Sequence, residues 1–372
     1  MSQNPPAMKV SSPTAPPAAG IFGCAGLTLT AWEKAFFRDV RPFGFILFAR
    51  NVDTPDQVKA LCQALREATD RPEAVILIDQ EGGRVRRLKP PHWRNAPPMG
   101  LFGQLYGQDP ERAIGLCRDN ARLIGLELAG LGIDTDCLPL LDLPIPGAHD
   151  IIGDRAFAAS AEPVIALGRA VLEGLGAAGV FPVIKHIPGH GRAVADSHLA
   201  LPVVDTDRQT LEQTDFAPFA ALADAPFAMT AHILYKALDA ERPATLSPSV
   251  IEKGIRQKIG FDGLLMCDDL SMKALGGAFE DRTRLALEAG CDLVLHCNGN
   301  QTEMTAIANT LRPLDADGLR RAEAAQRWRA KAQDPGAEDF DPLQAEADVR
   351  ETLAQFGWSG STAIDPRIGT GP

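Results

Sequence analysis

Three histidines, a lysine and an aspartate lie close together in the segment KHIPGHGRAVADSH, residues 185–198. His186 and His190 have the i,i+4 spacing of zinc ligands on a helix. A helix is not expected here, because Pro188 and two glycines lie between or beside these histidines. A purely structural loop is one alternative. A metal site built by the loop is another, with four candidate ligands: His186, His190, Asp196 and His198.

The end of the same segment offers acid–base chemistry. Asp196 and His198 are two residues apart, and in an extended or turning loop their side chains can lie on the same side of the chain. The carboxylate can then hold one imidazole nitrogen and leave the other for proton transfer. The two glycines of the segment would let this loop move when substrate binds.

A pair of carboxylates, Asp268 and Asp269, ends the apolar run GLLMCDD at residues 263–269. One of them could act as a nucleophile. Because side chains alternate along a strand, only one of the pair should point inward, and the sequence does not say which. The alternative is that Asp269 caps the following helix.

Other polar groups follow apolar runs in the same way. In IDQEGGRVRR, residues 78–87, Asp79 could accept hydrogen bonds from sugar hydroxyls, and Arg86 or Arg87 could return as a donor. Arg155, in IIGDRAF, would suit a hydroxyl- or carboxylate-bearing ligand. A polar turn and a surface arginine are the simpler alternatives.

The elements that must position these groups alternate along the chain. Short apolar runs that resemble buried parallel strands occur at residues 20–25, 43–49, 74–79, 133–140, 180–186, 227–233, 263–269 and 292–297. Helix-like segments lie between them at 54–69, 109–132, 162–179 and 247–261, the last with Ser247 and Gly260 as caps. The pattern predicts an α/β fold, a single-domain (β/α)8 TIM barrel, with a doubly wound open sheet as the alternative.

Barrel active sites lie where the strands end, so the polar residues at strand ends should share one mouth. These residues are Asp79, Lys185, His186, His232, Asp268 and Asp269. We expect a flexible lead-in at residues 1–19, a barrel at 20–332, and a helical or loose tail at 333–372.

Composition excludes some partners. The formal charge of -11 argues against nucleic acid and anionic membrane surfaces. No apolar run approaches the ~20 residues of a membrane helix, and the N-terminus does not resemble a signal peptide. Seven scattered cysteines fit small buried residues in a reduced, cytoplasmic protein.

Taken together, FARN, DQEGGRV, IGDRAF, KHIPGHG followed by DSH, and CDDLSM resemble glycoside hydrolase family 3, in particular its bacterial single-domain β-N-acetylglucosaminidases. The order and spacing match over approximately residues 20–300. The resemblance implies that Asp268 is the nucleophile and His198 the acid/base, with Asp196 as its partner. It also implies no metal or cofactor, and a set of residues that hold the terminal sugar: Asp79, Arg87, Arg155, Lys185 and His186.

The substrate implied by the resemblance is N-acetylglucosamine linked to 1,6-anhydro-N-acetylmuramic acid, with or without a peptide, in cytoplasmic cell-wall recycling. The enzyme would work as a monomer or weak dimer. Two residues depart from the family pattern, since Cys267 replaces a usual serine and Ile187 a usual phenylalanine. The alternatives are a family 3 phosphorylase, a metal-dependent hydrolase that uses the histidine loop, a silent sugar-binding barrel, and a mechanism assisted by the substrate's acetamido group.

Overall fold

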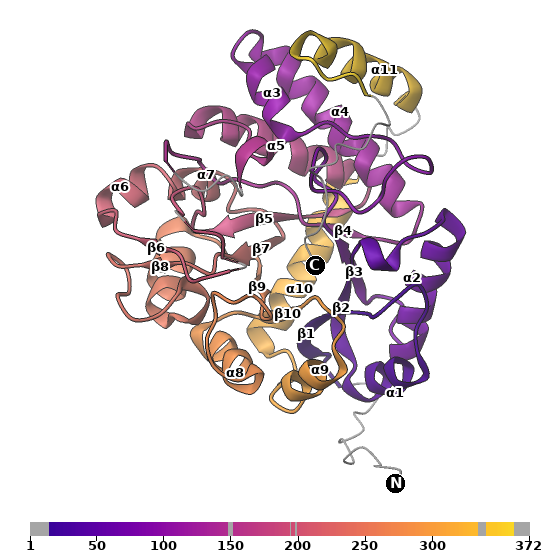
Figure 1. The fold of residues 1–372 in the computed structure, drawn as a ribbon, viewed down its shortest axis with the longest axis vertical. Coiled ribbons are helices and arrows are strands. Elements are labelled where there is room, and N and C mark those ends of the chain that lie inside the picture. The colour runs from indigo at the N-terminus through magenta and orange to yellow at the C-terminus, as the bar shows by residue number, and fades with distance from the viewer. Residues whose placement is uncertain (1–14, 148–151, 194, 198, 334–339, 361–372) are drawn as a thin grey trace.

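The computed structural model describes residues 15–147, 152–193, 195–197, 199–333 and 340–360. Its centre is a closed barrel of parallel strands in the order β1-β10-β9-β7-β5-β4-β3-β2 (Figure 1). The strands are β1 (Ala18–Gly23), β2 (Pro42–Leu47), β3 (Val75–Ile78), β4 (Thr135–Asp136), β5 (Phe181–Ile187), β7 (Phe227–Thr230), β9 (Leu264–Asp269) and β10 (Leu293–His296). The eight predicted strands and the TIM barrel are confirmed, and the doubly wound alternative is wrong.

Helices surround the barrel in Figure 1. They are α1 (Ala31–Val40), α2 (Pro55–Thr69), α3 (Met99–Tyr106), α4 (Pro110–Ala129), α5 (Ala161–Ala177), α6 (Arg208–Gln213), α7 (Phe216–Ala221), a π-helical segment (Val250–Ile259), α8 (Phe279–Ala289), α9 (Gln301–Ala308), α10 (Ala316–Ala332) and α11 (Pro342–Leu353). Two short strands, β6 (Val203–Val204) and β8 (Leu234–Tyr235), form a parallel pair outside the barrel.

The predicted caps Ser247 and Gly260 are present, and α2 begins with a cap as well. Thr54 accepts a hydrogen bond from the Gln57 backbone at the start of α2, directly before a proline. The Ser247 hydroxyl accepts from the Val250 N–H at 3.1 Å, as a capping residue does. Gly260 ends that helix with a φ of 81°, in the left-handed region that glycine adopts without strain.

The core is apolar on both faces of the strands, as expected for a parallel sheet covered by helices. Every residue of β2 and β3 is buried. All seven cysteines are buried free thiols, which confirms their predicted packing role. Within the described residues, no helix has both the length and the apolar character needed to span a bilayer.

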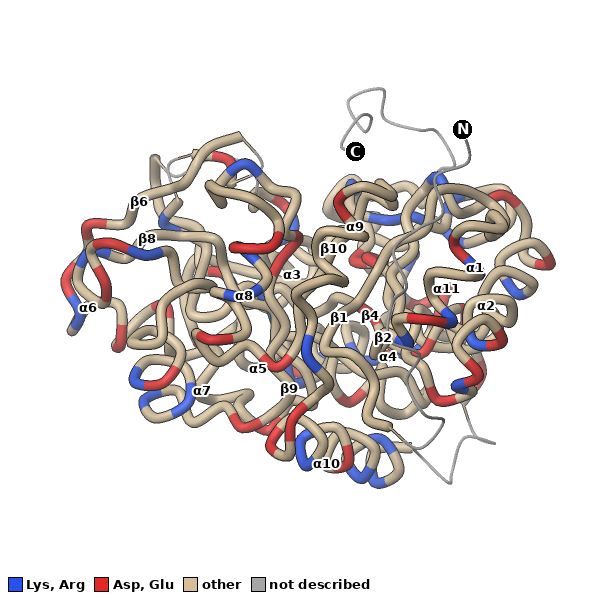
Figure 2. The backbone as a smooth tube through the Cα atoms, turned by 90° about the horizontal axis from the view of Figure 1, so that it is seen from below, with Lys and Arg blue, Asp and Glu red and all other residues tan. Residues whose placement is uncertain are grey.

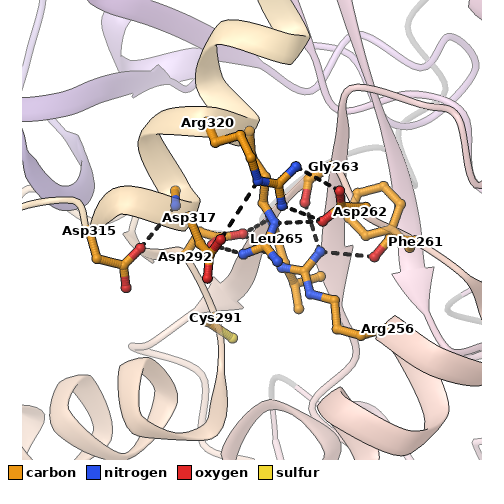
Figure 3. Close-up of polar contacts among 12 residues, drawn as sticks. Arg256, Phe261, Asp262, Gly263, Leu265, Cys291, Asp292, Asp315, Asp317 and Arg320 are labelled. Atoms are coloured by element: carbon orange, nitrogen blue, oxygen red, sulfur yellow. Dashed lines mark hydrogen bonds and ion pairs between the residues drawn. The ribbon is translucent and has the colours of Figure 1, made fainter.

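Ion pairs fix α10 to the barrel at the ends where β9 and β10 begin (Figure 3). Arg320 forms a bidentate pair with Asp262 at 2.7 and 2.8 Å. Buried Asp292 accepts from Arg256 at 2.8 Å and from Arg321 at 2.7 Å. On α10 itself, acidic and basic residues are interspersed (Figure 2). These contacts lie at the end of the barrel opposite to the strand ends that carry the predicted site.

The helix α11 lies against α3 and α4, at the top of Figure 1. Val349 and Leu353 on α11 are buried, and Arg122 lies over the Phe340 ring at 4.3 Å. Part of the predicted tail is therefore helical and packed on the barrel's outer helices. The predicted domain boundaries stay predictions.

Candidate active site

The carboxyl ends of the strands enclose a cavity of about 230 Å³. Eight residues singled out from the sequence line it together: Asp79, Arg87, Arg155, Lys185, His186, His190, Asp268 and Asp269. They come from the loops after β3, β4 and β5, and from β5 and β9 themselves. The expectation that these strand ends share one polar mouth is confirmed for these residues.

Lys185 lies at the centre of a network of opposite charges. Its Nζ is 3.0 Å from Asp79 Oδ1 and 2.5 Å from Glu81 Oε1. Arg87 pairs with the other Asp79 oxygen at 3.0 Å. Arg155 holds both Glu81 oxygens, at 2.9 and 2.8 Å. Two carboxylates and three cations therefore form one rigid frame along one wall of the cavity.

The frame keeps its charges over a wide pH range. Burial alone would raise the pKa of Glu81, but Arg155 and Lys185 outweigh it and bring the pKa to about 2. Burial opposes ionisation of Asp79 too, yet Lys185 and Arg87 hold its pKa well below the usual range. Burial would lower the pKa of Lys185, whereas Glu81 and Asp79 raise it. The carboxylates can thus accept hydrogen bonds from a neutral, hydroxyl-bearing ligand without changing protonation state.

His186 is oriented by a carboxylate that the sequence analysis missed. Its Nδ1 is 2.8 Å from Asp142 Oδ2, and both side chains are buried. Burial raises the pKa of Asp142, but the nearby His186 and the hydrogen bonds to Asp142 lower it by more. The carboxylate is therefore an acceptor. His186 Nδ1 therefore carries a proton and donates it to Asp142, which fixes the orientation of the ring.

The two aspartates of β9 have different environments. Asp269 accepts at Oδ1 from the backbone N–H of Ser271 and of Cys297, at 3.0 and 3.1 Å, and at Oδ2 from the Ser271 hydroxyl at 2.5 Å. Asp269 thus fixes the turn after β9 and ties it to the end of β10. This role resembles the helix cap that the sequence offered as the alternative for Asp269. Asp268 accepts from the Asp269 N–H at 2.8 Å. Both line the cavity.

The structure describes the histidine segment, residues 185–198, except for residues 194 and 198. His190 is buried, and its Nε2 is 3.2 Å from the Ser197 hydroxyl. Asp196 is half-buried, whereas His198 lies outside the described residues. In the part of the chain that the structure describes, no three His, Cys, Asp or Glu side chains gather as metal ligands would.

The chain matches the family model described as "Glycosyl hydrolase family 3 N terminal domain" over residues 33–328. This protein belongs to glycosyl hydrolase family 3. A beta-hexosaminidase of Alkalilimnicola ehrlichii is 37% identical over 342 residues, which cover 86% of this chain and 97% of that protein. A beta-hexosaminidase of Thiobacillus denitrificans is 40% identical over 281 residues, which cover 74% of this chain and 76% of that protein.

Solved structures of family 3 proteins share the fold. NagZ from Neisseria gonorrhoeae, in complex with N-trifluoroacetyl-D-glucosamine, superposes with a TM-score of 0.80 and 32% identity, covering 92% of this chain and 100% of that one. A family 3 beta-N-acetylglucosaminidase from Paenibacillus superposes with a TM-score of 0.78 and 30% identity. The match covers 90% of this chain and 66% of that one. The resemblance deduced from the motifs is confirmed at the level of the family.

One expectation about this family 3 site is corrected by the structure, and one choice that the sequence left open is made. His232 does not line the cavity but is buried beside it, where it bonds Thr245 Oγ1 at 2.7 Å and the Asp269 carbonyl at 3.1 Å. Its ring is thereby tied to the end of β9, the strand that carries both aspartates. Of Arg86 and Arg87, only Arg87 lines the cavity.

Arg50, within the FARN motif, also belongs to the site, although no role for it is predicted from the sequence. Its guanidinium donates to the carbonyls of Cys24 and Cys297, joining the ends of β1 and β10. The guanidinium carbons of Arg50 and Arg87 both lie close to the Phe48 ring, at 5.1 and 4.9 Å from its centroid. These cation–π contacts anchor both cations at the cavity wall, which all three residues line.

Proposed function

We propose that this family 3 enzyme is a retaining β-N-acetylhexosaminidase. It removes non-reducing terminal, β-linked N-acetylglucosamine from 1,6-anhydro-muropeptides in cytoplasmic cell-wall recycling. The observation that carries the proposal is the cavity in which a fixed frame of charges faces Asp268. The N-acyl glucosamine bound by NagZ of Neisseria gonorrhoeae supports the choice of sugar.

The charged frame would hold the sugar by its hydroxyls. Each Asp79 oxygen accepts one bond from the protein, at 3.0 Å from Lys185 or Arg87, and keeps a second lone pair for a hydroxyl. Arg155 and His186 reach the cavity from neighbouring strand ends. Such bonds orient the ring, so that the anomeric carbon meets the nucleophile in a reactive geometry.

The proposed reaction is a double displacement. Asp268 attacks the anomeric carbon while His198 protonates the departing glycosidic oxygen, which gives a covalent glycosyl-aspartate. Water, deprotonated by His198, then releases the sugar with its configuration retained. Asp196 would hold one nitrogen of that imidazole, and Asp269 would fix the turn beside the nucleophile. A histidine, with an ordinary pKa of ~6.5, needs little tuning for this work near neutral pH.

Turnover of p-nitrophenyl N-acetylglucosaminide tests the proposal. We expect release of the phenol and of N-acetylglucosamine at a rate that phosphate does not raise and exhaustive chelation does not lower. Formation of a sugar 1-phosphate would instead indicate the phosphorylase, and loss of activity on chelation the metal-dependent hydrolase. Binding without turnover would indicate a silent sugar-binding barrel. A second assay, with N-acetylglucosaminyl-1,6-anhydro-N-acetylmuramic acid, tests the leaving group.

A further inference from the structure

Ser197, the chain neighbour of the proposed acid/base, contacts both the start of its own segment and the loop after β9. The Ser197 hydroxyl is 3.2 Å from His190 Nε2, and both residues are buried. His190 is the histidine of the segment that the proposed reaction leaves without a role. A buried polar contact of this kind orders the groups it joins, because leaving either partner unpaired is costly.

His190 is itself held firmly. Its backbone N–H donates to Asp142 Oδ1 at 2.6 Å, and its ring meets the His186 ring edge-on at 5.4 Å. The next residue, Gly191, lies so close to the Leu143 carbonyl that an added Cβ would be 1.9 Å from its oxygen. His190 therefore belongs to the same rigid wall as His186 and offers a fixed partner to the loop.

Ser197 makes a second contact on the other side of the site. Its carbonyl accepts from the Ala274 N–H at 3.1 Å, in the segment that follows β9. Ala274 lies five residues beyond Asp269, whose side chain fixes the turn into this segment. Ser197 thus bridges the β5 side of the mouth to the β9 side, where the proposed nucleophile lies.

We propose that Ser197 is a positioning residue, and that its hydrogen bonds to His190 and Ala274 set the place of its chain neighbours Asp196 and His198 relative to Asp268. This inference rests on the proposed function, because it concerns the loop that would supply the proton. It also gives His190 a role: the ring anchors the loop instead of binding metal or transferring protons. Burial, and next the nearby His186, lower the pKa of His190 to about 4, so the ring is neutral at pH 7.

A displaced loop should affect one step above all, the protonation of the departing oxygen. A leaving group of low acidity needs the proton at the transition state, whereas an activated phenol needs it much less. Displacing the loop should therefore slow the first kind of substrate and spare the second. Ser197 and His190 line the cavity too. The Ser197 hydroxyl bonds to His190 and not to a residue proposed to hold the sugar, so affinity for N-acetylglucosamine itself should not change.

The experiment compares Ser197→Ala with the wild type on a disaccharide substrate and on an activated aryl glycoside. One lost buried hydrogen bond predicts a decrease of about 3- to 10-fold in kcat/KM for the disaccharide. For the aryl glycoside we expect less than about a 2-fold decrease, with an unchanged inhibition constant for N-acetylglucosamine. Thr69→Val, which removes a buried hydroxyl bonded to the Arg66 carbonyl, is the matched control and should match the wild type on both substrates.

Variants of His190 complete the test. His190→Leu should reproduce the Ser197→Ala profile, and His190→Gln, which retains a polar nitrogen, should restore part of the activity. The double variant should be no worse than the poorer single one, as expected of two partners in one contact. Equal losses on both substrates, or weaker binding of N-acetylglucosamine, would show a general structural role and overturn the inference.

One further comparison separates this inference from the proposed function. If His198→Ala discriminates between the two substrates but Ser197→Ala equals the wild type, the positioning role fails and the acid/base assignment stands. If His198→Ala itself does not discriminate, the acid/base assignment has failed. Adding Ser197→Ala to His198→Ala should cost nothing more, because the loop then has no proton donor to place.

Discussion

Glu81→Gln should reveal how strongly the charged frame stabilises the fold. Glu81 is 2% exposed and pairs with Lys185 at 2.5 Å and with Arg155 at 2.8 Å. The change removes the carboxylate's charge but keeps its shape, so two buried cations lose a shared partner. Breaking a buried ion pair from one side typically costs about 3–5 kcal/mol of folding free energy.

The pKa of Glu81 gives a second value for the contribution of this carboxylate to the folding free energy. A decrease from the ordinary 4.5 to about 2 corresponds to about 3 kcal/mol in favour of the folded state when the carboxylate is ionised. Because the folded-state pKa is the lower one, this stability is fully present above pH 4.5 and is lost as the pH falls toward 2. The free energy expected from breaking a buried ion pair and the free energy from the pKa shift therefore agree.

The assay is urea unfolding of the wild type and Glu81→Gln between pH 7 and pH 3. We expect a difference of about 3 kcal/mol at pH 7 that narrows as the pH falls below 4.5. The control is Glu73→Gln, whose carboxylate is 59% exposed and pairs with Arg71; its effect should stay below about 1 kcal/mol. A Glu81→Gln protein within about 1 kcal/mol of the wild type at pH 7, or a difference that does not change with pH, would refute the reasoning.

Two further predictions concern catalysis and stability. His198→Ala should lower kcat by ~10²–10⁴-fold with unactivated leaving groups and by much less with p-nitrophenol, measured as initial rates; equal losses would contradict its acid role. Asp292→Ala should lower the free energy of unfolding by about 3–5 kcal/mol, because Arg256 and Arg321 lose their shared buried carboxylate. For comparison, Asp317→Ala, which removes a pair exposed on both sides, should change it by less than about 1 kcal/mol in the same denaturation experiment.

The sequence predicted the barrel because its strands are short, apolar and evenly interrupted by helices. The least regular strand shows the limit of that pattern. Residues 133–140 were predicted as one strand, whereas β4 spans only Thr135–Asp136. Pro139 cannot donate to a neighbouring strand, and the chain beyond it keeps contact with β5 through single hydrogen bonds, as between the Pro139 carbonyl and the Lys185 N–H.

The site was predicted in part for the same reason. Asp79, Lys185 and Asp268 end apolar strands, so strand position alone brings them to one edge. Glu81 and Asp142 were missed because their partners are far away in the sequence. Asp142 precedes His186 by 44 residues, and only the register of neighbouring strands brings the two together. The signals were present, since Glu81 lies within DQEGGRV and Asp142 follows an apolar run, but no spacing rule connects them to their partners.

The most direct test of the central claim is trapping the covalent intermediate. The protein would be incubated with a slowly hydrolysed 2-fluoro glycoside, digested, and analysed by mass spectrometry of its peptides. We expect one added sugar, located on Asp268, and no addition to Asp268→Asn under the same conditions. Labelling of Asp269 instead would move the nucleophile. Persistent failure to trap any sugar on an active enzyme would contradict the covalent mechanism and favour participation of the substrate's own acetamido group.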